Sequence, residues 1–377
     1  MASAYQKIKL LQGLLTGKHA YTGPFHVVVG LTSRCNLRCV GCRYHSVFAQ
    51  RQKITDEAFT DESLPYETME RLCLDLRRLR CSAVLLMAEG EPLLHPRILD
   101  IVSLVKGMGF HATLITNGTL LTEEMMEGFI NRGLDYLHVS LWASSAAEYE
   151  KQYSGSHVNN YYRVVDGLKH AAALKKQHKK TSPAVVLHHV INRHNFENLD
   201  QVVKLAASTN CNALSLSPFL TAGGGLDEYA IPGNEEERLR FSLLGLKKTL
   251  DAHGLHHNIE RTLLRYNVRR EKGWNVPCYA GWFHARILSD GTVHPCGFCN
   301  VLCGNLKQKS FIEIWNDQPY RRFRKEALKR SSFPADAESC YCDYCCYAED
   351  NMRVHRLFRY ALPVVSRRVG KNGTVGR

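Results

Sequence analysis

The sequence has no long hydrophobic run and no secretion signal. None of its apolar stretches reaches the roughly 20 residues that a transmembrane helix needs. Residues 1–20 contain scattered lysines, without the apolar core and cleavage site of a signal peptide. We therefore expect a cytoplasmic protein.

Acidic residues are scarce relative to basic ones. The 377 residues include 49 Lys and Arg but 36 Asp and Glu, which gives a net charge of +13. This excess favours an acidic partner, such as a phosphorylated or carboxylated substrate, an anionic membrane or nucleic acid, without selecting among them. Cysteine is abundant, with 14 residues. In a chain without a secretion signal, this indicates metal binding in a reducing compartment.

Three cysteines form a C-x3-C-x2-C motif, Cys35, Cys39 and Cys42, directly after the apolar run 25–31. Thiolates select iron–sulfur clusters or zinc, and proteins normally supply four of them. A site with three thiolates keeps one metal position open, which is typical of catalysis. The alternatives are a zinc knuckle completed by His45, or three unrelated core cysteines.

A C-x3-C-x2-C loop after a first strand resembles the radical S-adenosylmethionine (radical SAM) superfamily. In that family the three cysteines hold a [4Fe–4S] cluster whose free iron binds S-adenosylmethionine. One electron, from a donor such as flavodoxin or ferredoxin, then yields a 5′-deoxyadenosyl radical that abstracts hydrogen from the substrate. The family often has an aromatic residue before the third cysteine, next to the adenine. This chain has Gly41 there, and Tyr44 is a candidate substitute.

Strand-like apolar runs alternate with amphipathic segments, which predicts βα units and a parallel sheet. Six units fit an open (β/α)6 partial barrel, with function at the carboxyl ends of the strands. The expected strands are 25–31, 83–87, 111–115, 135–141, 184–191 and 213–217, and the expected helices are 65–80, 96–108, 122–132, 160–176 and 197–207.

Polar residues follow the predicted strands. After the second, Gly90-Glu91-Pro92 resembles the family's Gly-Gly-Glu-Pro motif, which binds the methionine amino group; Glu89 stands where the family often has a small residue. Thr116 and Asn117 supply polar groups after the third strand. The resemblance implies a ribose or carboxylate contact from Ser140 after the fourth strand and a ribose contact from Asn192 after the fifth. Each residue taken alone also fits a helix cap or a turn.

Eight of the 14 cysteines lie between residues 278 and 350. The start of this region is Cys278-x12-Gly291-x4-Cys296, and Asp290-Gly291 predicts a β-hairpin. Together with Cys342-x2-Cys345, this start resembles the SPASM and twitch auxiliary-cluster domains. The full SPASM pattern needs a cysteine where this chain has Asn351, which favours one auxiliary [4Fe–4S] cluster.

The expected ligands of that cluster are Cys278, Cys296, Cys342 and Cys345. Either Cys340 or Cys346 could replace one of the last two, and structural zinc is the alternative occupant. Three readings stay open for Cys299 and Cys303: spare ligands, buried thiols, or a catalytic hydrogen-atom donor beside the substrate. The three remaining cysteines are expected in the core, namely Cys73, Cys81 and Cys211.

These observations predict five segments. They are a basic N-terminal extension (1–24), the radical SAM core (25–233), a helical linker (234–277, with a helix over 235–253), the auxiliary-cluster domain (278–350) and a basic C-terminal tail (351–377) with a loose Gly/Asn-rich end. The tail could contact an anionic membrane or an acidic substrate.

The resemblance implies an enzyme, and the positive charge favours a small anionic substrate: a sugar, or a nucleotide-linked or phosphorylated compound, that is oxidised, epimerised or rearranged. A peptide maturase is the alternative, although 24 residues leave no room for a peptide-recognition domain, and the length leaves none for a cobalamin domain. Nucleic acid is not an expected partner. The opposing class is a non-catalytic iron–sulfur carrier or assembly protein, which would have no use for Glu91, Ser140 and Asn192.

Overall fold

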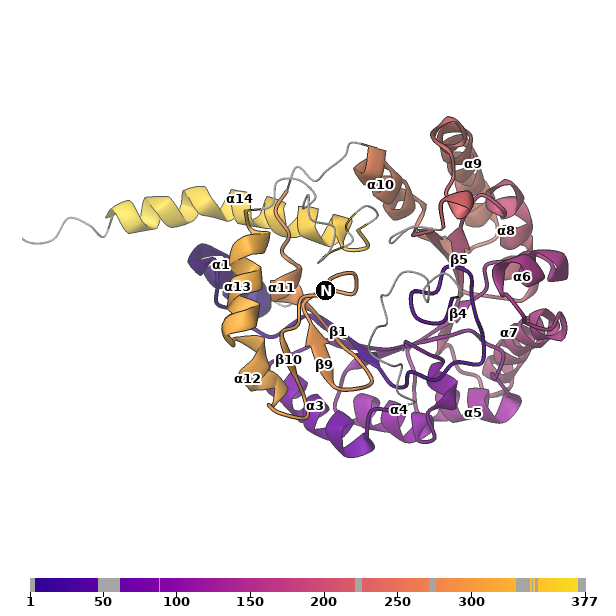
Figure 1. Cartoon of the computed structure of the whole chain (residues 1–377), viewed down its shortest axis with the longest axis horizontal. Helices are drawn as coiled ribbons and strands as arrows, with labels where there is room; N and C mark the ends of the chain where they lie inside the picture. The colour runs from indigo at the N-terminus through magenta and orange to yellow at the C-terminus, as the bar shows by residue number, and fades with distance from the viewer. Residues whose placement is uncertain are drawn as a thin grey trace, which may run out of the picture.

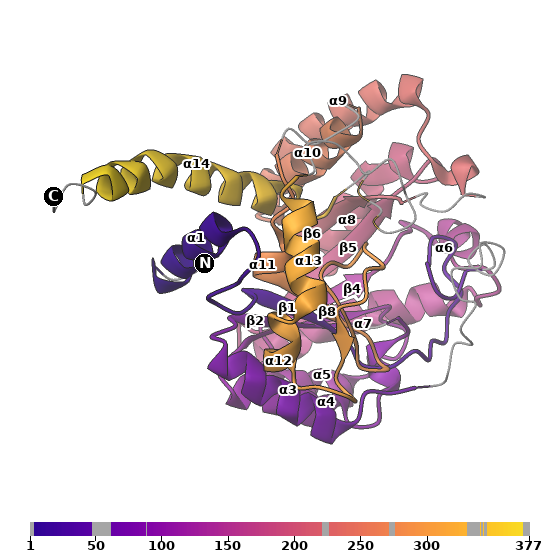
Figure 2. The same cartoon turned by 60° about the vertical axis from the view of Figure 1, so that its left-hand side comes forward.

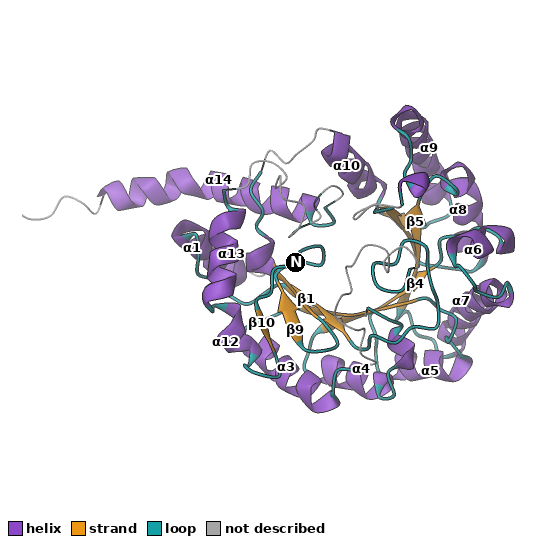
Figure 3. Ribbon diagram, in the orientation of Figure 1, coloured by secondary structure: helices purple, strands orange, loops and turns teal. Residues whose placement is uncertain are grey.

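The computed structural model describes residues 4–46, 62–87, 89–220, 226–270, 276–329, 340, 342 and 345–371. Its centre is a curved sheet with helices along the outer side (Figures 1 and 3). The strands of this sheet are β1 (His26–Gly30), β2 (Ala83–Met87), β3 (His111–Thr116), β4 (Tyr136–Ser140), β5 (Ala184–Ile191), β6 (Ala213–Pro218), β7 (His256–His257), β8 (His284–Ile287), β9 (Thr292–His294) and β10 (Gly304–Asn305).

The strand order is β10-β9-β8-β1-β2-β3-β4-β5-β6-β7. Pairing is parallel from β8 through β1 to β7 and antiparallel from β8 to β10. The six predicted strands are thus confirmed as β1 to β6 of a partial barrel. The predicted hairpin at Asp290-Gly291 is confirmed as the β8–β9 turn, where Gly291 has a φ of 87°.

Helices follow the strands as the alternation predicts. Along the main strands, alternate side chains such as Leu137 and Val139 are fully buried, because successive residues of a strand point to opposite faces. The helices are α1 (Ala4–Thr16), α3 (Tyr66–Arg78), α4 (Ile98–Gly107), α5 (Glu123–Asn131), α6 (Ala146–Gln152), α7 (Asn159–Gln177), α8 (Leu199–Ser208), α9 (Gly233–Ala252), α10 (Ile259–Arg270), α11 (Ala280–Phe283), α12 (Phe311–Trp315), α13 (Gln318–Ala327) and α14 (Ala348–Lys371).

The linker and the start of the basic tail are both helical. The expected helical linker contains α9 and α10, and the Thr262 side chain of α10 donates a hydrogen bond to the Leu216 carbonyl of β6 at 2.8 Å. The basic tail is helical to Lys371, and α14 extends beyond the body of the molecule (Figure 2). Most of the Gly/Asn-rich end that we expected to be loose lies outside the described residues.

The cysteine-rich C-terminal region shares its sheet with the barrel. β8 lies directly beside β1, with His284 opposite His26 and Arg286 opposite Val28. Among the described helices, none is long and apolar enough to span a membrane.

Candidate cluster and cofactor site

The loop with the first three cysteines begins just past the carboxyl end of β1. Asn36 fastens it to the segment after β3: its amide donates to the Thr119 hydroxyl at 2.8 Å and accepts from the Asn117 amide at 2.9 Å. On the other side, the Val40 N–H donates to the carbonyl of Gln152 in α6 at 3.0 Å. The loop is therefore held from both sides of the strand ends.

Burial raises the pKa of all three cysteine thiols in this loop, which favours their protonated form when no metal is bound. Burial raises the pKa of Cys35 to about 11 and raises that of Cys39 well above its usual value. Burial also raises the pKa of Cys42, which the backbone N–H groups of His45 and Tyr44 oppose by donating to its sulfur at 3.2 and 3.4 Å. A coordinating metal deprotonates such thiols outright, so the donor set fits an iron–sulfur cluster.

His45, the candidate fourth ligand of the zinc-knuckle alternative, is half-buried beside this loop. Burial lowers the pKa of its imidazole, and the backbone of Ser33 and Glu89 acts against this shift.

Glu91 braces three loops at the same end of the sheet. Its buried carboxylate accepts from the Leu93 N–H at 3.0 Å, the Thr116 hydroxyl at 2.6 Å and the Asn117 N–H at 2.7 Å. Its own N–H donates to the Arg34 carbonyl at 2.7 Å. A carboxylate has about four acceptor positions, so Glu91 keeps room for one further donor. Pro92, the next residue, starts a short 3-10 helix.

Gly90 lets two of these loops touch. Its N–H donates to the Thr32 carbonyl at 3.0 Å, and a Cβ atom at this position would lie 1.9 Å from the Arg34 carbonyl oxygen. Only glycine permits that approach without moving backbone.

Ser140 and Asn192 already have partners within the chain. The Ser140 hydroxyl accepts from the Trp142 indole N–H at 2.9 Å. The fully buried Asn192 amide exchanges hydrogen bonds with the Gln152 amide, at 2.8 and 3.3 Å. Both residues lie at strand ends as predicted, and Asn192 is turned into a buried amide pair.

The position before the third cysteine shows why this chain has no aromatic residue there. A Cβ atom on Gly41 would lie 2.4 Å from the ring of Phe219, which follows β6. The Phe219 ring also meets Trp142 edge-on, with ring centroids 6.3 Å apart. Tyr44, our candidate substitute, instead contacts Arg286 of β8.

The auxiliary region brings five cysteines together. Burial raises the pKa of Cys345 well above its usual value, and four further sulfurs add to the shift. Those four are Cys346, Cys296, Cys342 and Cys278. The four expected ligands therefore lie close together, and Cys346 lies among them.

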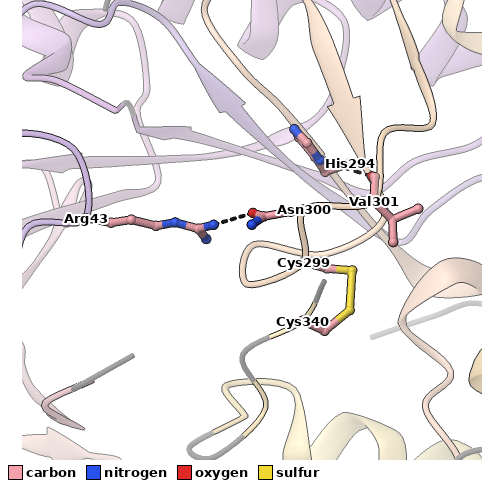
Figure 4. Close-up of a disulfide and its surroundings, with 6 residues drawn as sticks. All are labelled: Arg43, His294, Cys299, Asn300, Val301 and Cys340. Atoms are coloured by element: carbon pink, nitrogen blue, oxygen red, sulfur yellow. Dashed lines mark hydrogen bonds between the residues drawn. A yellow bond between two sulfur atoms is a disulfide. The ribbon is translucent and has the colours of Figure 1, made fainter. Parts of the chain in front are cut away.

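The other cysteines of this region are placed differently. Cys299 and Cys340 form a buried disulfide beside the expected ligands (Figure 4). The roles of Cys299 as a hydrogen-atom donor and of Cys340 as a replacement ligand stay predictions, and both require the two sulfurs in the reduced form. Burial raises the pKa of Cys303 to about 12, and its side chain packs in the main core. Cys73, Cys81 and Cys211 are buried there too, as expected.

Several residues of this site were not anticipated from the sequence. Asn36 stands inside the cysteine motif, yet a polar residue there carries no signal of its own. Gln152 and Phe219 reach the site through tertiary packing. Arg286 offered a weak signal, since a charged residue inside a short apolar strand suggests a specific partner.

Comparisons with known proteins agree with this geometry. The radical SAM superfamily model matches residues 29–206, and the SPASM iron–sulfur cluster-binding domain matches residues 278–349. The AdoMet-dependent heme synthase of Methanosarcina barkeri is 25% identical over 318 residues, which cover 79% of this chain and 84% of that protein.

Two solved structures share the fold. Streptococcus suis SuiB bound to S-adenosylmethionine has a TM-score of 0.63 at 14% identity, covering 81% of this chain and 68% of its own. The enzyme anSMEcpe with bound AdoMet has a TM-score of 0.63 at 16% identity, covering 93% and 96%. The domain matches confirm the predicted resemblance, and with it a [4Fe–4S] cluster with S-adenosylmethionine and an auxiliary iron–sulfur site.

Proposed function

We propose that this chain, which carries a radical SAM domain followed by a SPASM iron–sulfur domain, uses Cys35, Cys39 and Cys42 to bind the catalytic cluster and acts on a small carboxylate-bearing substrate. The observation that carries the proposal is the three-thiol loop, fastened beside the Glu91 brace at the carboxyl ends of parallel strands. When bound, the cluster and S-adenosylmethionine supply a radical that abstracts hydrogen.

The chain's own residues would hold this cofactor in one geometry. Gly90 and Glu91 keep the loops after β1, β2 and β3 in contact, and the free acceptor position of Glu91 suits the ammonium group of methionine. Trp142 and Phe219 offer an apolar aromatic surface beside Gly41 for the adenine. Ser140 lies next to this surface for a ribose contact. Buried walls of this kind also exclude water from a reactive species.

A buried polar patch with one guanidinium beside it supports an anionic substrate. The Nδ1 atom of His188 on β5 lies 3.2 Å from the hydroxyl oxygen of Ser215 on β6. These two side chains are on the opposite face of the sheet from Leu187 and Leu214, which pack in the core. Burial lowers the pKa of His188 to about 3, and the neighbouring His138 and Arg265 lower this pKa further. A neutral imidazole, a hydroxyl and a guanidinium can together bind a carboxylate.

The heme synthase relative makes this proposal more specific, because heme itself carries carboxylates. We therefore choose an iron porphyrin precursor as the first substrate to test. The structures with a similar fold support the peptide alternative, since one of them is SuiB bound to the precursor peptide SuiA. At 15% identity that likeness concerns the fold alone, so peptides form the second arm of the screen.

An electron donor such as flavodoxin or ferredoxin, and a weak contact of α14 with an anionic membrane, stay predictions. For the auxiliary site we assign Cys278, Cys296, Cys342 and Cys345 as ligands.

The test uses anaerobically reconstituted protein. Two clusters give about eight irons per chain, and incubation with dithionite and S-adenosylmethionine should yield 5′-deoxyadenosine. Cys35→Ala should lose about half of the iron and all of the product. Cys73→Ala, a buried cysteine away from the site, is the matched control and should keep both. Zinc in place of iron, or iron without 5′-deoxyadenosine, would favour the carrier class.

A further inference from the structure

Arg286 lies where the two cysteine-bearing regions meet. It belongs to β8, beside Val28 of β1. One of its terminal nitrogens donates to the Gly297 carbonyl at 2.8 Å, and the other donates to the Tyr44 hydroxyl at 2.5 Å. The two acceptors come from segments 253 positions apart in the sequence.

Both acceptors are next to proposed cluster ligands. Tyr44 stands two residues after Cys42, and Gly297 directly follows Cys296. A second contact joins the same two segments, since the Arg43 guanidinium donates to the Asn300 side chain (Figure 4). The loop that holds the catalytic thiols is thus connected to the auxiliary loop by two arginines.

A buried carboxylate lies close to Arg286. Glu89 takes the position where the family often has a small residue, and it is 6% exposed. One of its oxygens accepts from the Ser289 N–H at 3.0 Å, just after β8. Burial raises the pKa of Glu89, whereas the positive charge of Arg286 acts against this shift. The contact between the two cysteine-bearing regions therefore contains a buried carboxylate, Glu89, whose negative charge is partly offset by the positive charge of Arg286.

We propose that Arg286 is a positioning residue that fixes the loop of the catalytic cluster relative to the loop of the auxiliary cluster. This inference rests on the ligands assigned under the proposed function. A guanidinium is planar and presents several N–H donors in a rigid fork, so two acceptors bound to different nitrogens are held in one arrangement. An ammonium keeps the charge without this fork, which makes lysine an informative replacement.

The experiment compares Arg286→Lys and Arg286→Gln with the wild type, as anaerobically reconstituted full-length chains. Hydrogen exchange of residues 42–46 and 296–300 reports the connection directly. Losing charge-assisted hydrogen bonds should speed exchange in both segments by roughly tenfold or more. Arg238→Lys, in an exposed ion pair with Glu197 on another part of the surface, is the matched control and should leave both segments unchanged.

The cluster potentials separate positioning from charge. In Arg286→Gln the midpoint potentials of both clusters should fall, because a nearby positive charge favours the reduced form. In Arg286→Lys they should stay near those of the wild type while exchange still rises. Exchange within twofold of the wild type in both variants would overturn the proposal.

A second variant keeps the test usable if Arg286 variants do not fold. Tyr44→Phe removes one acceptor and leaves every charge in place, and it should speed exchange over residues 42–46. Unchanged exchange there would count against the proposal equally. If the wild type contains no cluster, the proposed function fails, while the exchange data still decide whether Arg286 connects the two loops.

Discussion

Replacing Thr116 by valine tests whether the Glu91 brace is a stabilising unit. Thr116 is 2% exposed, so valine keeps the shape of a buried side chain and removes only its hydroxyl. The hydroxyl donates to the Glu91 carboxylate at 2.6 Å and accepts from the Gly118 N–H at 3.0 Å. Losing a hydrogen bond to a charged group and leaving a buried N–H unpaired should lower the free energy of unfolding by about 2–4 kcal/mol.

The loss should depend on pH. Burial raises the pKa of Glu91, and the hydrogen bonds from Asn117 and Thr116 work against that shift. Removing Thr116 therefore raises the pKa further. A carboxyl group whose folded pKa lies above its unfolded value contributes stability at low pH that is lost as the pH rises through the folded pKa. The penalty of Thr116→Val should accordingly be larger at pH 8 than at pH 5.

Urea unfolding of the reconstituted protein at both pH values measures this difference. Thr249→Val, an exposed threonine of α9, is the matched control and should change stability by less than about 0.5 kcal/mol. A loss in Thr116→Val no larger than in the control, or one equal at the two pH values, would refute the role of Glu91 as a buried ionised brace.

Three further predictions concern the cofactor and cluster sites. Gly90→Ala places a Cβ atom 1.9 Å from the Arg34 carbonyl oxygen, so the two loops must separate. Calorimetry should then show S-adenosylmethionine binding at least tenfold weaker, and unchanged binding would contradict the close approach of the loops. Phe219→Ala should raise the KM for S-adenosylmethionine while iron content stays constant, and an unchanged KM would remove Phe219 from the adenine surface. Cys345→Ser should lose about four irons and Cys346→Ser none, whereas the reverse result would exchange their roles.

The strands could be predicted from sequence because each is a short apolar run ended by polar or glycine-containing turns. β8 could not be placed in the same way. Residues 284–287 indicated one arm of a hairpin, and this prediction was confirmed. Their second neighbour, β1, is paired through His26 and His284, a contact between distant segments that no local pattern contains.

The cofactor site shows the same division between local pattern and tertiary pairing. The position of Asn192 after β5 could be predicted, because it follows from strand length. Its partner could not, since Gln152 lies in α6 and meets Asn192 only after α6 folds back over the strand ends. For Cys299, the sequence left three roles open, and only the folded chain brings it to Cys340.

The polar groups at the strand ends connect the loops to one another as well as facing a ligand. Glu91 joins the segments after β2 and β3, Asn36 joins the cysteine loop to Asn117, and Val40 joins it to α6 through Gln152. These bonds all lie within the chain, so the protein's own residues hold the loops in one arrangement. Binding then costs less ordering of loops, which is how preorganised sites gain affinity. A residue can therefore be essential for S-adenosylmethionine binding without touching it, and variants of Thr116 and Asn36 should weaken binding even where no contact is lost.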